Sequence, residues 1–229
     1  GALATVIAVP IALTSGTTVT KDWTVSGIKS IYDLNAHYAK LIISGTKLPT
    51  HPSSYKVLSS TIKNARGPIT SNIKLTQVTG GVQLGFDDST LVASTIYKVV
   101  IDGDSTPIET EQHILQPVIN IGTQPIDHTI ASGTTSKKVT LTVAATVQNQ
   151  INGKSLTYQW QNSDRNDVSS FENISSATSA SYEYDATHDP VSTKKYFRCV
   201  VSYEYTEAKP SSSVYVEKAT GSYNQPPAE

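Results

Sequence analysis

The chain has 229 residues, of which 16% are charged, and its formal net charge is −1 at pH 7. This length is enough for two ordinary domains, each with its own hydrophobic core. Basic and acidic residues number nine and eight in residues 1–115 and nine and eleven in residues 116–229, so neither half has the basic excess of a protein that binds nucleic acid or an anionic membrane.

The chain opens on an apolar, strand-forming run, Thr5–Leu13. No basic region precedes it and Pro10 interrupts it, so we interpret it as a strand and turn and not as a signal peptide. No stretch of the sequence approaches the roughly 20 apolar residues of a membrane-spanning helix. Because the run is apolar on both faces, we predict that it pairs with a partner subunit during assembly. The residues expected to form this assembly strand are Val6, Ile7, Val9, Ile11 and Leu13.

Most of the remaining first half reads as strands. Strands are predicted within Lys21–Ile28 and Thr95–Ile101, and alternating apolar residues on both sides of two glycines predict a hairpin within Asn72–Phe86. The stretch Ile31–Ile43 is ambiguous, because its apolar residues recur at helical spacing although several of them are middling helix formers. We favour a short helix there.

The sequence pattern changes near Pro117, and this change predicts a linker between two domains. The stretch Asp104–Pro117 mixes polar residues with proline and is interpreted as a domain boundary. After it, short strands and turns recur about every ten residues, as in a β-sandwich. We therefore predict an all-β chain with a β-rich attachment domain over residues 1–115, a β-sandwich over residues 116–218 and a flexible tail over residues 219–229.

The second half carries the more specific pattern. Val139–Val147 alternates apolar and polar residues, as a strand with one buried face does, and the turn dipeptide Asn152-Gly153 follows. Strands are then expected at Leu156–Gln161, Tyr196–Ser202 and Ser212–Val216.

This order of strands resembles an immunoglobulin-like domain of the intermediate-set type over residues 117–218. In that family a tryptophan on the third strand packs on the core, and Trp160 matches it; Cys199 matches the cysteine of the sixth strand. The cysteine of the second strand is absent, with Val143 or Ala145 in its place, so the resemblance implies a domain without a disulfide. The residues implied to form its core are Trp160, Cys199, Phe197, Val143 and Leu141.

Two further expectations come from the same resemblance. Phe197 stands where the family has the tyrosine of the tyrosine corner, so that hydrogen bond is expected to be missing. The stretch Phe171–Tyr184 is expected to form the fourth and fifth strands. Disulfide-free domains of this kind are similar to those on structural proteins of tailed bacteriophages.

The sequence offers little for catalysis or metal binding. No two of the five histidines have the spacing of a metal motif, and one cysteine is too few for a structural zinc site. The carboxylates of Asp87-Asp88 and Asp102-Gly103-Asp104 lack the glutamate of a calcium loop and are read as turns. We predict no enzyme, no catalytic or metal-binding residue and no cofactor.

Among the twelve tyrosines, a cluster lies in the second half of the chain: Tyr182, Tyr184, Tyr203, Tyr205 and Tyr215. Binding surfaces favour tyrosine, but so does any β-sheet, and the sheet is the simpler explanation. Tyr203 and Tyr205 alternate without a strong apolar neighbour, and we list them as candidate surface-binding residues.

These features favour a protein that binds or assembles. The leading hypothesis is a bacteriophage virion structural protein, assembled in the host cytoplasm, and within the virion a capsid decoration protein. The expected partners are capsid or tail subunits and further copies of the chain. The alternatives are a tail-tube or fibre subunit, or a cell-surface adhesin or carbohydrate-binding module that recognises host surface glycans.

Overall fold

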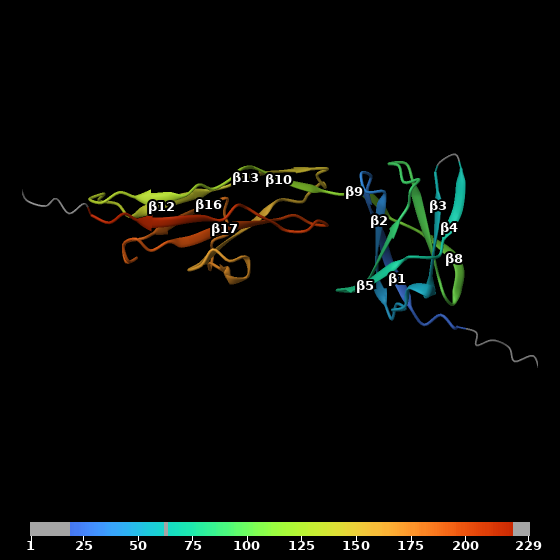
Figure 1. Ribbon diagram of the computed structural model, residues 1–229. Helices are drawn as coiled ribbons and strands as arrows, with labels where there is room; N and C mark the ends of the chain where they lie inside the picture. Colours follow the sequence, from blue (N-terminus) through green and yellow to red (C-terminus); the bar gives the residue numbers. More distant parts are fainter. Residues whose placement is uncertain (1–18, 62–63, 222–229) are drawn as a thin grey trace, which may run out of the picture. The chain divides into compact units, whose positions relative to one another are not determined.

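A computed structural model of the chain describes residues 19–61 and 64–221. The chain divides into two compact units, Gly1–Ile114 and Leu115–Glu229, here called unit 1 and unit 2 (Figure 1). Regular structure within the described ranges consists of strands and two short 3-10 turns, η1 (Pro52–Ser54) and η2 (Val168–Ser170), so the fold is all-β. The predicted assembly run Thr5–Leu13 lies outside the described residues.

Unit 1 consists of two β-sheets, in which the pairs among β5, β6, β2 and β1 and among β4, β3, β7 and β8 are antiparallel. The first has the order β5-β6-β2-β1-β9 and the second the order β4-β3-β7-β8. The strands of the first sheet are β1 (Thr24–Asp33), β2 (Tyr38–Thr46), β5 (Lys74–Val78), β6 (Gly81–Asp87) and β9 (Gln112–Leu115). Those of the second are β3 (Tyr55–Ser60), β4 (Ala65–Ile69), β7 (Ile96–Ile101) and β8 (Asp104–Glu109).

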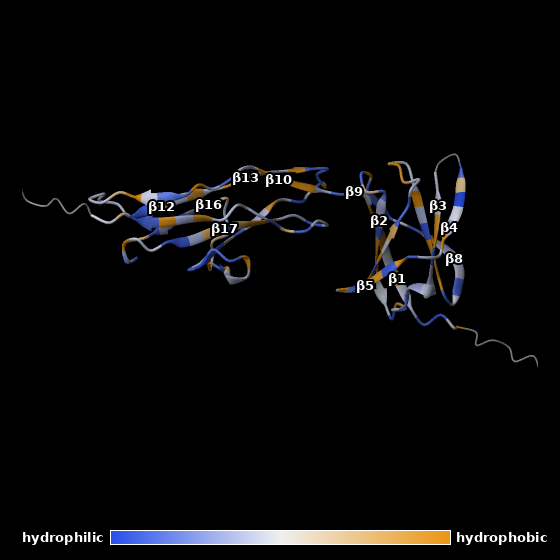
Figure 2. Cartoon of the chain, in the orientation of Figure 1, coloured by the Kyte–Doolittle hydropathy of each residue, from blue (hydrophilic) through white to orange (hydrophobic). Residues whose placement is uncertain are grey.

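Every second residue of the central strands of unit 1 is buried. In β2 these residues are Ala39, Leu41 and Ile43, each fully buried, and they pack with residues from both sheets in one hydrophobic cluster. Hydrophobic and hydrophilic residues accordingly alternate along several strands (Figure 2). The predicted hairpin within Asn72–Phe86 is present, and its two-residue turn places Gly80 at φ 78°, a conformation that glycine adopts without strain.

The short helix predicted at Ile31–Ile43 is wrong. The segment is the hairpin of β1 and β2, with Asp33 paired to Tyr38 across the turn. The Asp33 carboxylate accepts a hydrogen bond from the Ala36 backbone N–H, and His37 takes a φ of 51°. The apparent helical spacing arose from counting apolar residues through this turn, while in β2 the buried residues Ala39, Leu41 and Ile43 follow the two-residue period of a strand.

The stretch interpreted as a linker from Asp104 onward also differs from the expectation. It contains β8 and β9, one in each sheet of unit 1, and the division between the units falls between Ile114 and Leu115. Both are polar strands, and β8 contains Pro107, which is tolerated because β8 lies at a sheet edge where its missing N–H is not needed.

Unit 2 is an immunoglobulin-like β-sandwich. In one layer, β10 (Val118–Thr123) pairs with β13 (Ala144–Gln148), and β12 (Lys138–Thr142) pairs with β16 (Ser181–Asp185). The other layer has the order β11-β19-β17-β14-β15, with β18 (Lys209–Pro210) beside β17. Its strands are β11 (His128–Ile130), β14 (Thr157–Ser163), β15 (Glu172–Asn173), β17 (Lys195–Ser202) and β19 (Val214–Lys218). The first strand thus crosses from one layer to the other, and β11 runs parallel to β19.

The expected fourth strand of unit 2 lies in the other layer. β15 pairs with β14, not with β16, and the Gln161 amide donates a hydrogen bond to the Asn173 side chain at 2.8 Å. Only β16 forms from the later part of Phe171–Tyr184, so the assignment of that stretch to the fourth and fifth strands is wrong for its first part.

Candidate functional site

The residues singled out as the core of the sandwich lie in its interior. Trp160, Phe197 and Cys199 are fully buried, and Leu141 and Val143 are 1% and 2% exposed. Trp160 is paired with Cys199 across β14 and β17, and its indole N–H donates to the Ser179 carbonyl at 2.9 Å. Burial raises the pKa of the Cys199 thiol to about 11, so the thiol stays protonated near neutral pH and is a poor nucleophile.

Tyr203 is a correction, because a surface-binding role requires exposure and Tyr203 is only 6% exposed. Its hydroxyl accepts a hydrogen bond from the Ile151 N–H at 2.8 Å and donates to the Ile151 carbonyl at 3.2 Å. Tyr203 therefore ties the end of β17 to the loop before β14. Phe197 stands where the family has the tyrosine of the tyrosine corner, so that hydrogen bond was expected to be missing. Tyr203 makes a bond of the same kind, from a tyrosine hydroxyl to a distant part of the backbone.

Tyr205, the other candidate, lies in the turn after β17. It is partly exposed and takes a φ of 63°, and its carbonyl accepts a hydrogen bond from the Gln116 side chain at 2.7 Å. Its backbone therefore holds the first residues of unit 2 in place.

The arrangement in unit 1 that most resembles a catalytic one is a Ser–His pair that the sequence did not reveal. Ser30 Oγ lies 2.6 Å from His113 Nδ1, and Tyr32 Oη lies 2.8 Å from the same nitrogen. Ser30 also bonds to the Gln112 carbonyl, and Tyr32 donates to the Thr95 carbonyl.

The hydrogen-bond pattern of this pair is structural. The hydroxyls of Ser30 and Tyr32 donate to the Gln112 and Thr95 carbonyls, and their oxygens can share one proton on His113 Nδ1, from which the Thr110 hydroxyl lies 3.1 Å away. Ser30 is fully buried, so a substrate cannot reach its hydroxyl. Burial lowers the pKa of His113, against the opposing charge of Glu109. The cluster fastens β9 to β1.

The acidic turns of unit 1 are occupied by protein donors. Tyr97 donates to Asp88 at 2.6 Å, and the Thr90 hydroxyl and N–H donate to the same carboxylate. Burial alone would raise the pKa of Asp88, but the hydrogen bonds from Thr90 and Tyr97 hold it below its usual value. Asp104 pairs with Lys21 at 3.1 Å. No group of three or more histidine, cysteine, aspartate or glutamate residues suited to a metal ion occurs among residues 19–61 and 64–221.

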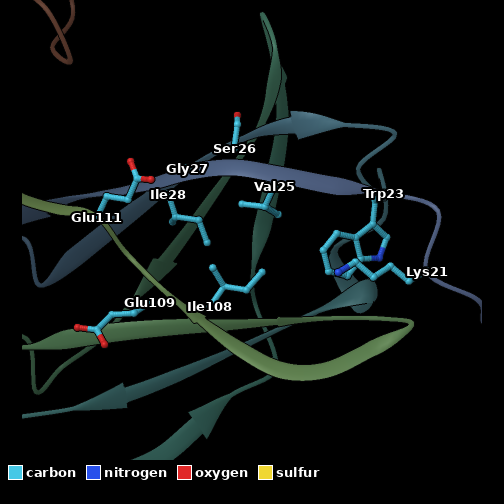
Figure 3. A pocket seen from close by; sticks show the side chains of 9 residues that line it. All are labelled: Lys21, Trp23, Val25, Ser26, Gly27, Ile28, Ile108, Glu109 and Glu111. Atoms are coloured by element: carbon cyan, nitrogen blue, oxygen red, sulfur yellow. The ribbon is translucent and has the colours of Figure 1, made fainter.

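An open groove lies between the two sheets of unit 1, at the edge where β1 faces β8 (Figure 3). We call it the β1–β8 groove; its volume is about 310 Å³. Val25 and Ile28 point toward it from β1, and Ile108 points toward them from β8. Its further lining residues are Lys21, Trp23, Ser26, Gly27, Glu109 and Glu111.

The two ends of the β1–β8 groove differ in charge. At one end the Trp23 indole donates to the Asp102 carbonyl at 2.7 Å, and the Lys21 ammonium lies 4.6 Å from the centre of the Trp23 ring. At the other end are the carboxylates of Glu109 and Glu111 (Figure 3). Trp23 is 3% exposed, so it offers no open ring face for stacking a sugar.

A second, smaller groove of about 260 Å³ lies in unit 2. It forms where the chain crosses from β10 to β11, beside the free edge of β12, and is lined by Thr123–Ile126, His128 and Thr140–Thr142. Ile126 is 67% exposed there.

Comparisons with known proteins give a fold and no activity. Residues 120–219 match the model of a family described as Domain of unknown function (DUF8696). No curated protein matches the chain. Within the described parts of the chain, no helix is long and apolar enough to cross a membrane.

Solved structures similar to the chain include modular β-proteins of several kinds. The fibronectin(III)-like modules of Clostridium thermocellum CbhA match at 11% identity and a TM-score of 0.33, over 90% of this chain and 99% of that one. Three N-terminal domains of the bacteriophage RB49 Highly Immunogenic Outer Capsid protein match at 15% identity and a TM-score of 0.34, over 86% of this chain and 59% of that one. Domains A168–A170 from titin match at 13% identity and a TM-score of 0.35, over 82% of this chain and 60% of that one. The chain thus spans about three fifths of the phage and titin structures.

Proposed function

We propose that this chain is a structural protein of a tailed-bacteriophage virion, and within the virion a capsid decoration protein. Unit 1 attaches to the particle, and unit 2 projects as a disulfide-free immunoglobulin-like domain of the intermediate-set type. The observation that carries the proposal is that the two units have separate hydrophobic cores with no residue in common. One unit can therefore be held at an interface while the other stays folded and displayed.

The chemistry of the chain supports a role in assembly over catalysis. The polar clusters of unit 1 are satisfied internally, and the thiol of unit 2 is buried. Two features remain for binding another chain: the β1–β8 groove and, from the sequence, the apolar run Thr5–Leu13. Exposed strand edges bind other chains through backbone hydrogen bonds. The partners we propose are capsid or tail subunits and further copies of this chain, with no nucleic acid and no membrane.

Co-sedimentation with the native particle tests this function. Two truncated chains, one lacking residues 1–13 and one ending at residue 116, are mixed separately with virions stripped of the protein. We expect the chain ending at residue 116 to sediment with the particle and the chain lacking residues 1–13 to remain in the supernatant. If only the chain lacking residues 1–13, which keeps unit 2, sediments, the roles of the units are reversed; if neither chain binds, the virion assignment fails.

Gold labelling of intact virions places the protein within the particle. Label over the head is the result expected for a decoration protein. Label along the tail would favour the tail-tube or fibre subunit instead.

A further inference from the structure

The β1–β8 groove exists because two strand edges lack partners. β1 pairs with β2 from Thr24 to Asp33, with a register shift between Val25 and Gly27, but on its other side the four-residue strand β9 lies beside its later part, where the Glu111 N–H donates to the Ile28 carbonyl. β8 pairs with β7 and, among the described strands, with no other. Among the described strands, none pairs with Thr24–Gly27 of β1 on the side of the groove.

We infer that this groove accepts an extended strand from a second copy of the chain, and that the strand is Thr5–Leu13. The inference rests on the assembly role proposed above and names the site that would perform it. The added strand continues the first sheet beside Thr24–Gly27 and covers the apolar side chains of Val25, Ile28 and Ile108.

The chemistry of the run fits the groove. Val25, Ile28 and Ile108 form an apolar strip within the groove, and no residue among positions 1–20 carries a charged side chain. The charged groups at its ends, Lys21 at one and Glu109 and Glu111 at the other, can stay hydrated while an uncharged strand lies between them. Nine extended residues span about 30 Å, which is more than enough to pass the four residues of the open edge.

Proline positions favour β1 over β8 as the backbone partner. Pro107 removes one N–H from β8, so that edge is the poorer template for pairing. Pro10 removes one N–H from the incoming strand, and the outer edge of an added strand tolerates that loss.

The contacts that hold Lys21–Trp23 in place favour a Thr5–Leu13 strand from a second copy over the same segment of the chain itself. The Lys21 ammonium pairs with Asp104, and the Trp23 indole donates to the Asp102 carbonyl. A methyl group added at Gly103 would lie 2.8 Å from the Lys21 backbone nitrogen, so the chain passes directly against this turn. These contacts close that end of the groove with the chain's own backbone, and its own run would have to fold back over them to enter.

Two variants of the full chain test the inference by complementation. A chain lacking residues 1–13 keeps the groove but has no strand to donate. A chain with Ile108→Glu keeps the strand but has a charge in the groove. By sedimentation velocity, we expect the wild-type chain to self-associate head to tail and each variant alone to stay monomeric, with the dissociation constant of Ile108→Glu raised at least about tenfold. A mixture of the two variants should form a one-to-one dimer and nothing larger.

The matched control is Val92→Glu, which puts the same charge on an apolar side chain of unit 1 that is 46% exposed and outside the groove. It should associate like the wild type. A mixture that stays monomeric while the wild type associates would overturn the inference, as would a wild-type chain that is monomeric at all concentrations.

Amide hydrogen exchange provides a second measurement that leaves the groove unmutated. Residues Thr24–Gly27 should exchange at least about tenfold faster in the chain lacking residues 1–13 than in the associated wild-type chain. Equal exchange rates overturn the inference even if Ile108→Glu fails to fold. Protection that persists in dilute wild-type monomer overturns it too, because the strand would then come from the same chain. Both assays use purified protein alone, so their outcome is separate from binding to virions.

Discussion

Replacing Tyr203 by phenylalanine tests whether this residue fastens unit 2 or forms part of a binding surface. The ring stays buried in the variant, so the apolar area removed from water does not change. What is lost is the hydroxyl that bonds the Ile151 N–H at 2.8 Å and the Ile151 carbonyl at 3.2 Å. Each neutral hydrogen bond contributes about 0.5–1.5 kcal/mol net, and a buried group left unpaired costs about 1–3 kcal/mol.

We expect Tyr203→Phe to lower the free energy of unfolding of unit 2 by about 2 kcal/mol. Ile151 is only partly buried, so water can recover part of the loss and hold the value below the upper limit. For a domain of this size the change corresponds to a fall in Tm of roughly 8–16 °C. Urea unfolding should show a lower midpoint with an unchanged slope.

The matched control is Tyr215→Phe. Tyr215 is partly exposed, and the Lys194 ammonium lies 4.1 Å from the centre of its ring. Phenylalanine keeps that ring, so the contact remains in the variant. That variant should lie within about 0.5 kcal/mol of the wild type. If Tyr203→Phe is as stable as the wild type but attaches less well to particles, the hydroxyl serves binding and the structural reading is refuted.

Four further predictions address the cores, the polar cluster and the boundary. Trp160→Ala should destabilise unit 2 by about 3–5 kcal/mol while unit 1 stays folded, and near-ultraviolet circular dichroism of each unit separates the two effects. Cys199→Ala should cost about 1–2 kcal/mol and leave assembly intact; lost assembly in a folded variant would point to thiol chemistry instead. The lowered pKa of His113 means that the unfolded chain binds its proton more tightly, so stability should be full above about pH 6.5 and fall as the pH drops below it, a slope that should flatten in His113→Gln. Limited proteolysis should cut first within residues 115–117 or after residue 219, and a first cut inside β8 would contradict this boundary.

The second unit was the easier half to predict from sequence because its strands bury one face. In β17 every second residue is buried, from Phe197 through Cys199 to Val201, and the pattern can be read directly. The same alternation continues to Tyr203, so the sequence already held the signal that this tyrosine points inward. The prediction that Tyr203 lies on the surface relied on the polar residues around it and neglected the two-residue period of the strand.

The first unit was harder to predict because its features depend on contacts between residues that are far apart in the sequence. β8 is polar and contains Pro107, features that resemble a linker until β7 is known to lie beside it. The pair of Ser30 and His113 joins residues 83 positions apart, which no local pattern connects. The groove itself is a missing pairing, and a sequence does not state which edges remain open.

The parallel pairing of β11 with β19 has a mechanical consequence. The chain enters unit 2 ahead of β11 and leaves it after β19, and the two strands run in the same direction through His128–Ile130 and Val216–Lys218. Tension between the ends of the unit therefore slides these strands along each other, so their hydrogen bonds carry the load together and do not open one after another. A domain built in this way resists being pulled apart by shear, although no disulfide joins its two layers.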